Sequence, residues 1–441
     1  MNKQISILFL ALSGLCLAGN VTLVGTTTSL TSTEKPNPLV TFSGFASFKS
    51  RATFSSDERY FATFFNESVQ LIDLLTGEER IVLLPKDSML FNSFGTLQFR
   101  PDTHELYFVG GRSPIRIVIP EQGVAHASVR PFTFLNERVD IGVEEMKFST
   151  DGKYLSLVFT RRHETESNAH VQALRVFDSE NGATLLSPKA EQFAFEFSSD
   201  ERSILYVSDD HLRVISHEIS SDEPSTLIKW RSRRPGVPQI LTVRSSPTVA
   251  VRTRMEIEVL PTGNTRSRIA LKPEAGCAFG PAALSDSGLI AFTEEKGRGT
   301  HLVKVAQIRG SKTPDKTTVQ RKSQGDVSSL RLSRDGSLLV LTTNNQEVEV
   351  VPLAAPEKSK LARISDFYEL DPQMVVRNIV WNDPHAESVV EFSPEATYVV
   401  LGVPEHRIQM VLRTSDLVSK QGCGTELKKS SNLPKLGLNG K

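Results

Sequence analysis

Arginine residues in predicted turns are the side chains with the clearest capacity for chemistry in this chain. A guanidinium group presents a fixed fork of N–H donors that matches the geometry of carboxylate and phosphate groups. We single out as partner-binding candidates Arg112, Arg161, Arg162, Arg231, Arg233, Arg234, Arg254 and Arg298. Charged residues are also the ordinary content of solvated turns. These arginines are far apart in sequence, so they could act together only if the fold brings their turns to one surface.

One predicted turn invites a metal-site hypothesis, because it holds His163, Glu164, Glu166 and His170. In the His-Glu-Xaa-Xaa-His motif, two imidazoles share one face of a helix and can bind the same zinc ion. The histidines here do not have that spacing and lie in a turn. We therefore predict no metal site, and nothing in the sequence indicates a cofactor.

The elements that must position these residues come from a recurring pattern. In Phe148-Ser149-Thr150-Asp151-Gly152, an apolar strand end runs into a tight turn, and a second strand begins at Tyr154. Gly152 suits the positive φ of such a turn, and Asp151 can accept hydrogen bonds from the backbone amides that follow it. The pattern predicts a β-hairpin rather than a catalytic loop.

Eight copies of this pattern occur along the chain. Their marker residues, which end the apolar strand, are Phe54, Phe99, Phe148, Phe197, Val243, Leu284, Leu332 and Phe392. Successive markers are separated by 45, 49, 49, 46, 41, 48 and 60 residues. This period is that of propeller blades, and each copy contains enough apolar runs for four strands. A four-stranded sheet cannot bury both faces alone, so neighbouring copies must stack around a ring.

We therefore predict an all-β protein, a β-propeller of four-stranded blades, with eight blades favoured and seven as the alternative. In such a blade, the turn between the second and third strands opens on the same rim as the link to the next blade. The eight candidate arginines fall in these connections, which predicts that they gather on one rim. We also expect the strand at 39–42 to complete the last blade, which lacks a fourth strand of its own.

The Phe-Ser-Xaa-Asp-Gly turns, each followed by a strand of the Tyr-Leu type, resemble the WD40-like propeller repeats of exported bacterial proteins, including the propeller of the periplasmic Tol system. The resemblance covers roughly Leu39 to Leu412. It implies the propeller fold and not an activity, because these repeats recur in proteins of unrelated function. Quinoprotein dehydrogenases with eight blades repeat tryptophan motifs, whereas only Trp230 and Trp381 occur here, which argues against that enzyme class.

The ends of the chain have their own signatures. Ile5 to Ala18 is an uncharged, largely apolar run of 14 residues behind a single lysine, which is typical of a secretory signal peptide and shorter than the roughly 20 residues of a membrane-spanning helix. We predict a signal peptide at 1–19, a flexible linker at 20–37, the propeller at 38–413 and a basic, disordered tail at 414–441. The protein is then periplasmic, secreted or at the cell surface, without a transmembrane segment once the signal is removed. A lipoprotein anchored through Cys16 is less favoured, because Leu15 precedes it.

Two cysteines follow the predicted signal peptide, Cys277 and Cys423. An even number of cysteines in an exported protein permits a disulfide. A bond between them would hold the tail against the ring, and two free thiols are the alternative.

The composition adds one exclusion. With 51 basic and 51 acidic residues, the 441-residue chain has no net charge, so no global field attracts it to nucleic acid. We expect an exported, non-catalytic scaffold that binds a protein partner, with acidic groups of that partner on the arginine rim. The alternative is a propeller-type hydrolase or lactonase with its site at the central channel, which requires at least three ionisable side chains to converge on the channel mouth.

Overall fold

The computed structural model describes residues 40–43, 52–65, 68–85, 96–110, 114–134, 143–162, 170–188, 194–208, 212–230, 238–243, 246–260, 268–297, 301–308, 314–344, 347–363, 389–403 and 408–414. Contacts divide the chain into the units Met1–Lys35 and Pro36–Lys441, and all described residues belong to the second. Within these ranges, two short 3-10 helices, η2 (Val124–His126) and η4 (Pro356–Lys358), accompany the strands. No helix within these ranges is long and apolar enough to span a membrane.

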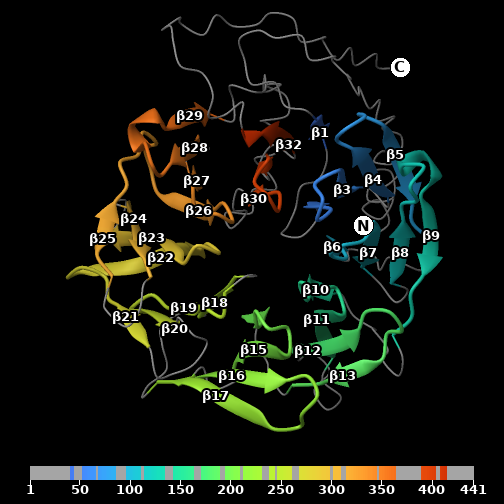
Figure 1. Cartoon of the computed structure of the whole chain (residues 1–441), viewed down its shortest axis with the longest axis horizontal. Coiled ribbons are helices and arrows are strands. Elements are labelled where there is room, and N and C mark those ends of the chain that lie inside the picture. The colour runs from blue at the N-terminus through green and yellow to red at the C-terminus, as the bar shows by residue number, and fades with distance from the viewer. Residues whose placement is uncertain are drawn as a thin grey trace, which may run out of the picture. The chain divides into compact units, whose positions relative to one another are not determined.

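Eight four-stranded sheets, the blades of a propeller, surround a common centre in the second unit (Figure 1). The predicted all-β propeller is confirmed, and the number of hydrogen-bonded sheets equals the number of repeats in the sequence. We number the blades in chain order, so that blade one contains the marker Phe54 and blade eight contains Phe392.

The strands of blades one to four are β2 (Ala52–Phe54), β3 (Tyr60–Phe65), β4 (Ser68–Asp73), β5 (Glu79–Leu83), β6 (Thr96–Phe99), β7 (Glu105–Val109), β8 (Ile115–Val118), β9 (Ser128–Pro131), β10 (Val143–Phe148), β11 (Tyr154–Arg162), β12 (His170–Asp178), β13 (Thr184–Leu186), β14 (Phe195–Phe197), β15 (Ser203–Val207), β16 (Arg213–Glu218) and β17 (Pro224–Lys229). Those of blades five to eight are β18 (Gln239–Thr242), β19 (Val249–Arg252), β20 (Ile257–Leu260), β21 (Ile269–Leu271), β22 (Cys277–Leu284), β23 (Leu289–Lys296), β24 (His301–Gln307), β25 (Lys316–Thr318), β26 (Val327–Leu332), β27 (Leu338–Thr343), β28 (Glu347–Pro352), β29 (Lys360–Arg363), β30 (Val389–Phe392), β31 (Tyr398–Val403), β32 (Ile408–Arg413) and β1 (Val40–Ser43).

Consecutive strands in each blade are antiparallel, so their connections alternate between the two ends of the sheet. We call the end with the first-to-second and third-to-fourth connections the motif face. The opposite end, with the second-to-third connections and the links between blades, is the loop rim. The first strands line the centre of the ring and contact one another, as β2 contacts β6 and β6 contacts β10 (Figure 1).

The last blade is completed from the other end of the chain. Strand β1 pairs antiparallel with β32, with Val40 opposite Val411. Blade eight therefore has the order β1-β32-β31-β30, with its outermost strand donated by the segment that precedes blade one. The predicted pairing of the two ends is confirmed.

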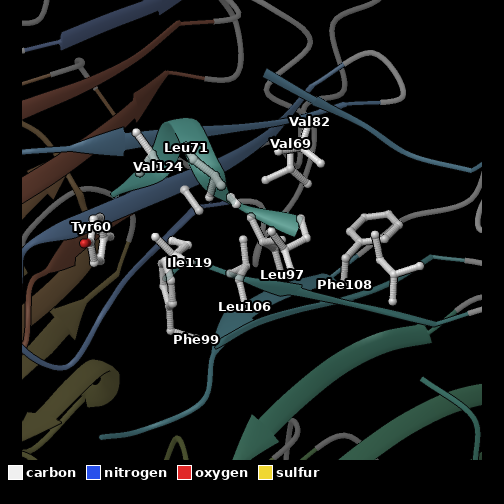
Figure 2. Packing of buried hydrophobic residues seen from close by; sticks show 14 of the residues in the cluster. Tyr60, Val69, Leu71, Val82, Leu97, Phe99, Leu106, Phe108, Ile119 and Val124 are labelled. Atoms are coloured by element: carbon white, nitrogen blue, oxygen red, sulfur yellow. The ribbon is translucent and has the colours of Figure 1, made fainter. Parts of the chain in front are cut away.

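The hydrophobic core lies between blades rather than within any one of them. Between blades one and two, Tyr60 and Leu71 pack against Leu106 and Phe108, with Val124 of η2 in the same cluster (Figure 2). These side chains are 0 to 1 % exposed. Burial of a large apolar side chain stabilises the fold by roughly 1.5–3 kcal/mol, so each blade depends on its neighbour for much of its stability.

The motif turn has the geometry that its residue types predict. In blade three, the Ser149 hydroxyl accepts a hydrogen bond from the Tyr154 amide at 2.9 Å and donates one to Asp151 at 2.7 Å. The Asp151 carboxylate accepts a further bond from the Lys153 amide at 3.0 Å. Gly152 has a φ of 69°, which an L-residue adopts only at a cost. Serine, aspartate and glycine thus each fill one role in the turn.

In four blades, a described residue other than glycine has a left-handed conformation in the motif turn. They are Glu58, Asp102, Glu201 and Ala396, with φ near 60° (58°, 56°, 60° and 59°). The Glu201 carboxylate accepts a hydrogen bond from the Asp151 amide of blade three at 2.8 Å, and Glu58 accepts one from the Glu395 amide of blade eight. At two of these positions, a contact to the preceding blade therefore compensates for the backbone strain.

One sequence-based boundary was wrong. We placed Arg161, Arg162 and His170 in an expanded turn of blade three, but the strands continue through them. Arg161 pairs with Val171, and Arg162 pairs with His170. Each strand of this hairpin is nine residues long, because cross-strand pairing extends past the apolar residues from which we judged its length.

Candidate functional site at the channel mouth

The marker residues of the repeats surround a cavity where the first strands end on the motif face. Seven of the eight markers line it, and we call them the collar: Phe54, Phe99, Phe148, Val243, Leu284, Leu332 and Phe392. The cavity has a volume of about 400 Å³. Because every blade places its first strand nearest the axis, most residues that end this strand face the mouth of the channel, and Phe197 of blade four is the exception. The periodicity of the sequence therefore becomes an apolar ring in space.

Polar groups interrupt this apolar lining. They are Thr53, Ser56, Gln98, Thr242 and Ser393, together with the charged residues Asp286, Arg331 and Arg334. The Ser56 hydroxyl already accepts a hydrogen bond from the Asp102 amide of blade two at 3.0 Å. The cavity thus combines nine apolar residues with eight polar or charged ones. A small-molecule site needs apolar surface together with polar groups that fix the orientation of the ligand.

Arg334 at this mouth is bound to carboxylates on both sides. Its Nε lies 2.6 Å from Asp286 of blade six, and its Nη1 lies 2.9 Å from Glu395 of blade eight. The hydrogen bond that Arg334 donates to Asp286 is the main cause of the raised pKa of Arg334. The guanidinium therefore joins three consecutive blades, and its charge is neutralised within the turn.

Arg331, also in blade seven, differs from Arg334. It is exposed on the first strand β26, where its Nη1 donates a hydrogen bond to the Leu330 carbonyl at 3.3 Å. It forms no ion pair with any other residue that the structure describes. Two arginines three positions apart in one blade thus have different electrostatic environments.

A second charged cluster joins the first strands of blades three and four. Lys147 lies 2.6 Å from Glu196 and 3.0 Å from Glu145, and its ammonium group also donates to the Phe195 carbonyl at 2.9 Å. Burial raises the pKa of Glu196, and the charges of Lys147 and Arg331 act against this rise. The charge of Arg331 therefore reaches Glu196, while the ion pair of Glu196 is made with Lys147.

Bonds between turns connect most neighbouring blades around the motif face. His104 of blade two lies 2.9 Å from Asp57 of blade one, and Arg100 of blade two donates to the Gly152 carbonyl of blade three at 3.0 Å. The bonds of Glu201, Glu58 and Arg334 described above continue this series. Because these contacts join the turns that form the cavity, they hold the collar in place.

The hydrolase alternative required three ionisable side chains at the channel mouth, and Asp286, Arg331 and Arg334 meet that count. Their arrangement is less suited to catalysis. The one carboxylate among them is paired with Arg334, and the described lining contains no histidine, cysteine, lysine or tyrosine that could serve as a nucleophile or base. The site therefore has the means to bind a molecule but lacks an evident catalytic pair.

Only three of the eight arginines of the predicted rim are among the described residues. By their numbers, all eight arginines fall in or beside loop-rim connections, but Arg112, Arg231, Arg233, Arg234 and Arg298 lie outside the described residues. Arg161 and Arg162 end strand β11. Arg254 is exposed between β19 and β20, with its guanidinium 4.0 Å from Glu295. Convergence of the arginines on one rim stays a prediction.

The candidate disulfide and the candidate metal site also fall partly outside the described residues. Cys277 is half-buried and is bonded to no described cysteine, and Cys423 lies outside the described residues, so the disulfide stays a prediction. His163, Glu164 and Glu166 also lie outside them. Across the residues that are described, no three histidine, cysteine or carboxylate side chains form a group that could hold a metal ion.

The collar and Arg331 were not identified as a binding site from the sequence. The available signal was the marker pattern itself, since seven of the eight residues that end the innermost strands lie at the channel mouth. We assigned the markers to strand ends without drawing that consequence. Arg331 precedes a marker, and nothing in the sequence distinguishes it from the ion-paired Arg334.

Comparison with known proteins supports the fold. No protein-family model and no curated protein sequence matches the chain. Among solved structures, Sqt1 from Chaetomium thermophilum is similar with a TM-score of 0.58 and 12% identity, over 86% of this chain and 99% of that chain. Sqt1 from Saccharomyces cerevisiae has a TM-score of 0.55 and 11% identity, over 86% and 99%. Sqt1 from Chaetomium thermophilum bound to the N-terminus of the ribosomal protein L10 has a TM-score of 0.54 and 13% identity, over 82% and 95%. At these identities the likeness shows the fold alone, which is a WD40-like propeller.

Proposed function

We propose that this protein is an exported, non-catalytic β-propeller scaffold that binds a protein partner through its loop rim. The observation that carries this proposal is the composition of the channel mouth, whose single carboxylate is neutralised by an arginine and whose described lining offers no nucleophile with a base. A closed ring of blades can present a surface to another protein without any chemistry at its axis. The fold it shares with Sqt1, which has been solved with the N-terminus of L10, is compatible with this role.

The partner surface in this proposal is the loop rim with its eight arginines. Arginine forks bind carboxylates in two-point contacts, and a cluster of them would orient an acidic partner and raise its association rate. Arg254, the described member with an exposed side chain in a turn, lies only at the 4.0 Å limit of contact with Glu295, so its guanidinium is available to a partner.

The test compares two triple variants that each remove three positive charges. Arg231, Arg233 and Arg234 are replaced by alanine in one, and Lys153, Arg202 and Lys358 in the other. The second set is exposed in motif-face connections, so the two variants have the same net charge. Full-length wild-type and variant proteins are used as bait with envelope extract. A partner that is lost with the rim variant and kept with the motif-face variant supports the proposal, and equal capture by all three proteins contradicts it.

Export is tested separately, because a cytoplasmic scaffold could use the same surface. The signal-peptide prediction expects the mature protein in the periplasm or medium, with its N-terminus after Ala18 or Gly19. Fractionation followed by mass spectrometry of the N-terminal peptide measures both. An intact Met1 in a cytoplasmic fraction would contradict export, and a lipid on Cys16 would support the lipoprotein alternative.

A further inference from the structure

Arg331 and Arg334 offer a comparison within a single cavity. Both line the channel mouth and both belong to blade seven. Arg334 has carboxylates at 2.6 Å and 2.9 Å, whereas Arg331 forms no ion pair with a described residue and its side chain donates a hydrogen bond to the carbonyl of the preceding residue. A guanidinium has five donors, and a single bond at 3.3 Å leaves most of them available.

The nearby acidic residues do not occupy the remaining N–H donors of Arg331. Glu196 is within electrostatic range of Arg331, but it is bound to Lys147 at 2.6 Å. Asp286, the one carboxylate of the cavity lining, is bound to Arg334. The cavity therefore has one cation whose fork is directed to no anion of the described chain, beside carboxylates that are already paired.

The rest of the cavity indicates what kind of molecule would carry the anionic group that binds Arg331. The collar supplies aromatic and aliphatic side chains from seven blades, and hydroxyl groups lie among them. The volume of about 400 Å³ is within the range of small-molecule sites. An inorganic anion would leave the collar unused, and a neutral apolar molecule would leave the guanidinium unpaired.

We propose that the channel mouth binds a small amphipathic anion, with its carboxylate or phosphate group on Arg331 and its apolar body against the collar. This site is on the motif face and is independent of the proposed partner surface on the loop rim. A carboxylate and a phosphate share the chemistry that the guanidinium recognises, so the experiment includes both.

The experiment is isothermal titration of the full-length protein at neutral pH and low salt with octanoate, octyl phosphate and 1-octanol. The three probes share an eight-carbon chain and differ in the head group. We expect at least one of the two anions to bind about tenfold more tightly than the alcohol, since one charge-assisted contact contributes roughly that factor. The stronger of the two anions identifies the head group that the site prefers.

Variants assign the binding to the two parts of the site. Arg331→Gln should weaken the anion about tenfold and leave 1-octanol unchanged, because only the charged contact is lost. Arg130→Gln, at an exposed position of strand β9, is the matched control and should leave all three affinities unchanged. Phe392→Ser shortens a half-buried collar residue and should weaken all three probes. Thermal unfolding of each variant confirms that it is folded.

Several outcomes would overturn the proposal. They are no binding of any probe, equal binding of anions and alcohol, and an anion affinity that Arg331→Gln leaves unchanged. Competition by an acidic peptide as strong as that of octanoate would also overturn it, since the site would then belong to a protein partner.

Discussion

The two ends of the blades differ in what their residues do for the protein. On the motif face, the turns are built from recurring serine, aspartate and glycine and are bonded to the turns of the next blade. On the loop rim, the connections vary in length and composition, and Arg254 is exposed with a contact only at 4.0 Å. The recurring residues of the sequence thus lie on the face whose turns join neighbouring blades. The connections that depart from the repeat lie on the opposite face.

This difference predicts that changes on the motif face alter stability and that changes on the loop rim alter binding. Three substitutions test it, from the largest expected effect on stability to the smallest. Each is measured by urea unfolding of the full-length protein, with secondary structure followed by circular dichroism.

Gly182→Ala should have the largest effect. Gly182 lies in the third-to-fourth connection of blade three with a φ of 74°, and a Cβ placed there would lie 2.2 Å from the Thr133 carbonyl oxygen. Left-handed strain and the displacement of a backbone atom together should cost about 3 kcal/mol of the free energy of unfolding. The control is Gly276→Ala, which also has a positive φ (78°) but no atom within 4 Å, and which should cost only about 1 kcal/mol. Equal losses would show that the contact with the link from blade two is unimportant.

Asp151→Ala should have an intermediate effect, about 1–2 kcal/mol at neutral pH, because the Ser149 hydroxyl and the Lys153 amide lose their acceptor. Burial acts to raise the pKa of Asp151, but these hydrogen bonds outweigh it and lower the pKa from 3.8 to about 2. A lowered pKa in the folded state means that the contribution is complete above pH 3.8 and is lost as the pH falls through about 2. The difference in the free energy of unfolding between wild type and Asp151→Ala should therefore decrease as the pH falls from 3.8 to about 2.

The control for Asp151 is Asp222→Ala, an exposed carboxylate in blade four. Its removal should change stability little at any pH. A wild-type advantage over Asp151→Ala that persists unchanged at low pH would contradict the assigned role of the carboxylate.

Arg254→Ala should have the smallest effect. An exposed arginine with one distant carboxylate contributes less than about 0.5 kcal/mol. If the rim is the partner surface, the same variant should weaken partner capture while its unfolding curve overlays that of wild type. A loss of stability above about 1 kcal/mol would show that Arg254 stabilises the fold. It would contradict the prediction that changes on the loop rim alter binding and not stability.

The marker residues explain why so much of the fold could be predicted. The turn that follows a marker such as Phe148 is closed by hydrogen bonds between residues within five positions of one another, so local sequence predicts it. The charged contacts could not be predicted in the same way. Arg334 is paired because Asp286 in blade six precedes the usual acid position by one residue and because Glu395 approaches from blade eight. Those partners are 48 and 61 residues away, and only the closed ring brings them together.

The pairing of β1 with β32 in blade eight, which we call the seam, has a consequence for folding during synthesis. Val40 and Val411 lie side by side without a covalent link. The ring can therefore close only after almost the whole propeller has left the ribosome, and blade eight of a nascent chain is incomplete until then. The same adjacency means that the two ends could be fused by a short peptide and the chain reopened between two other blades. Such a rearranged chain would have its seam as an ordinary hairpin and a new gap elsewhere on the circle.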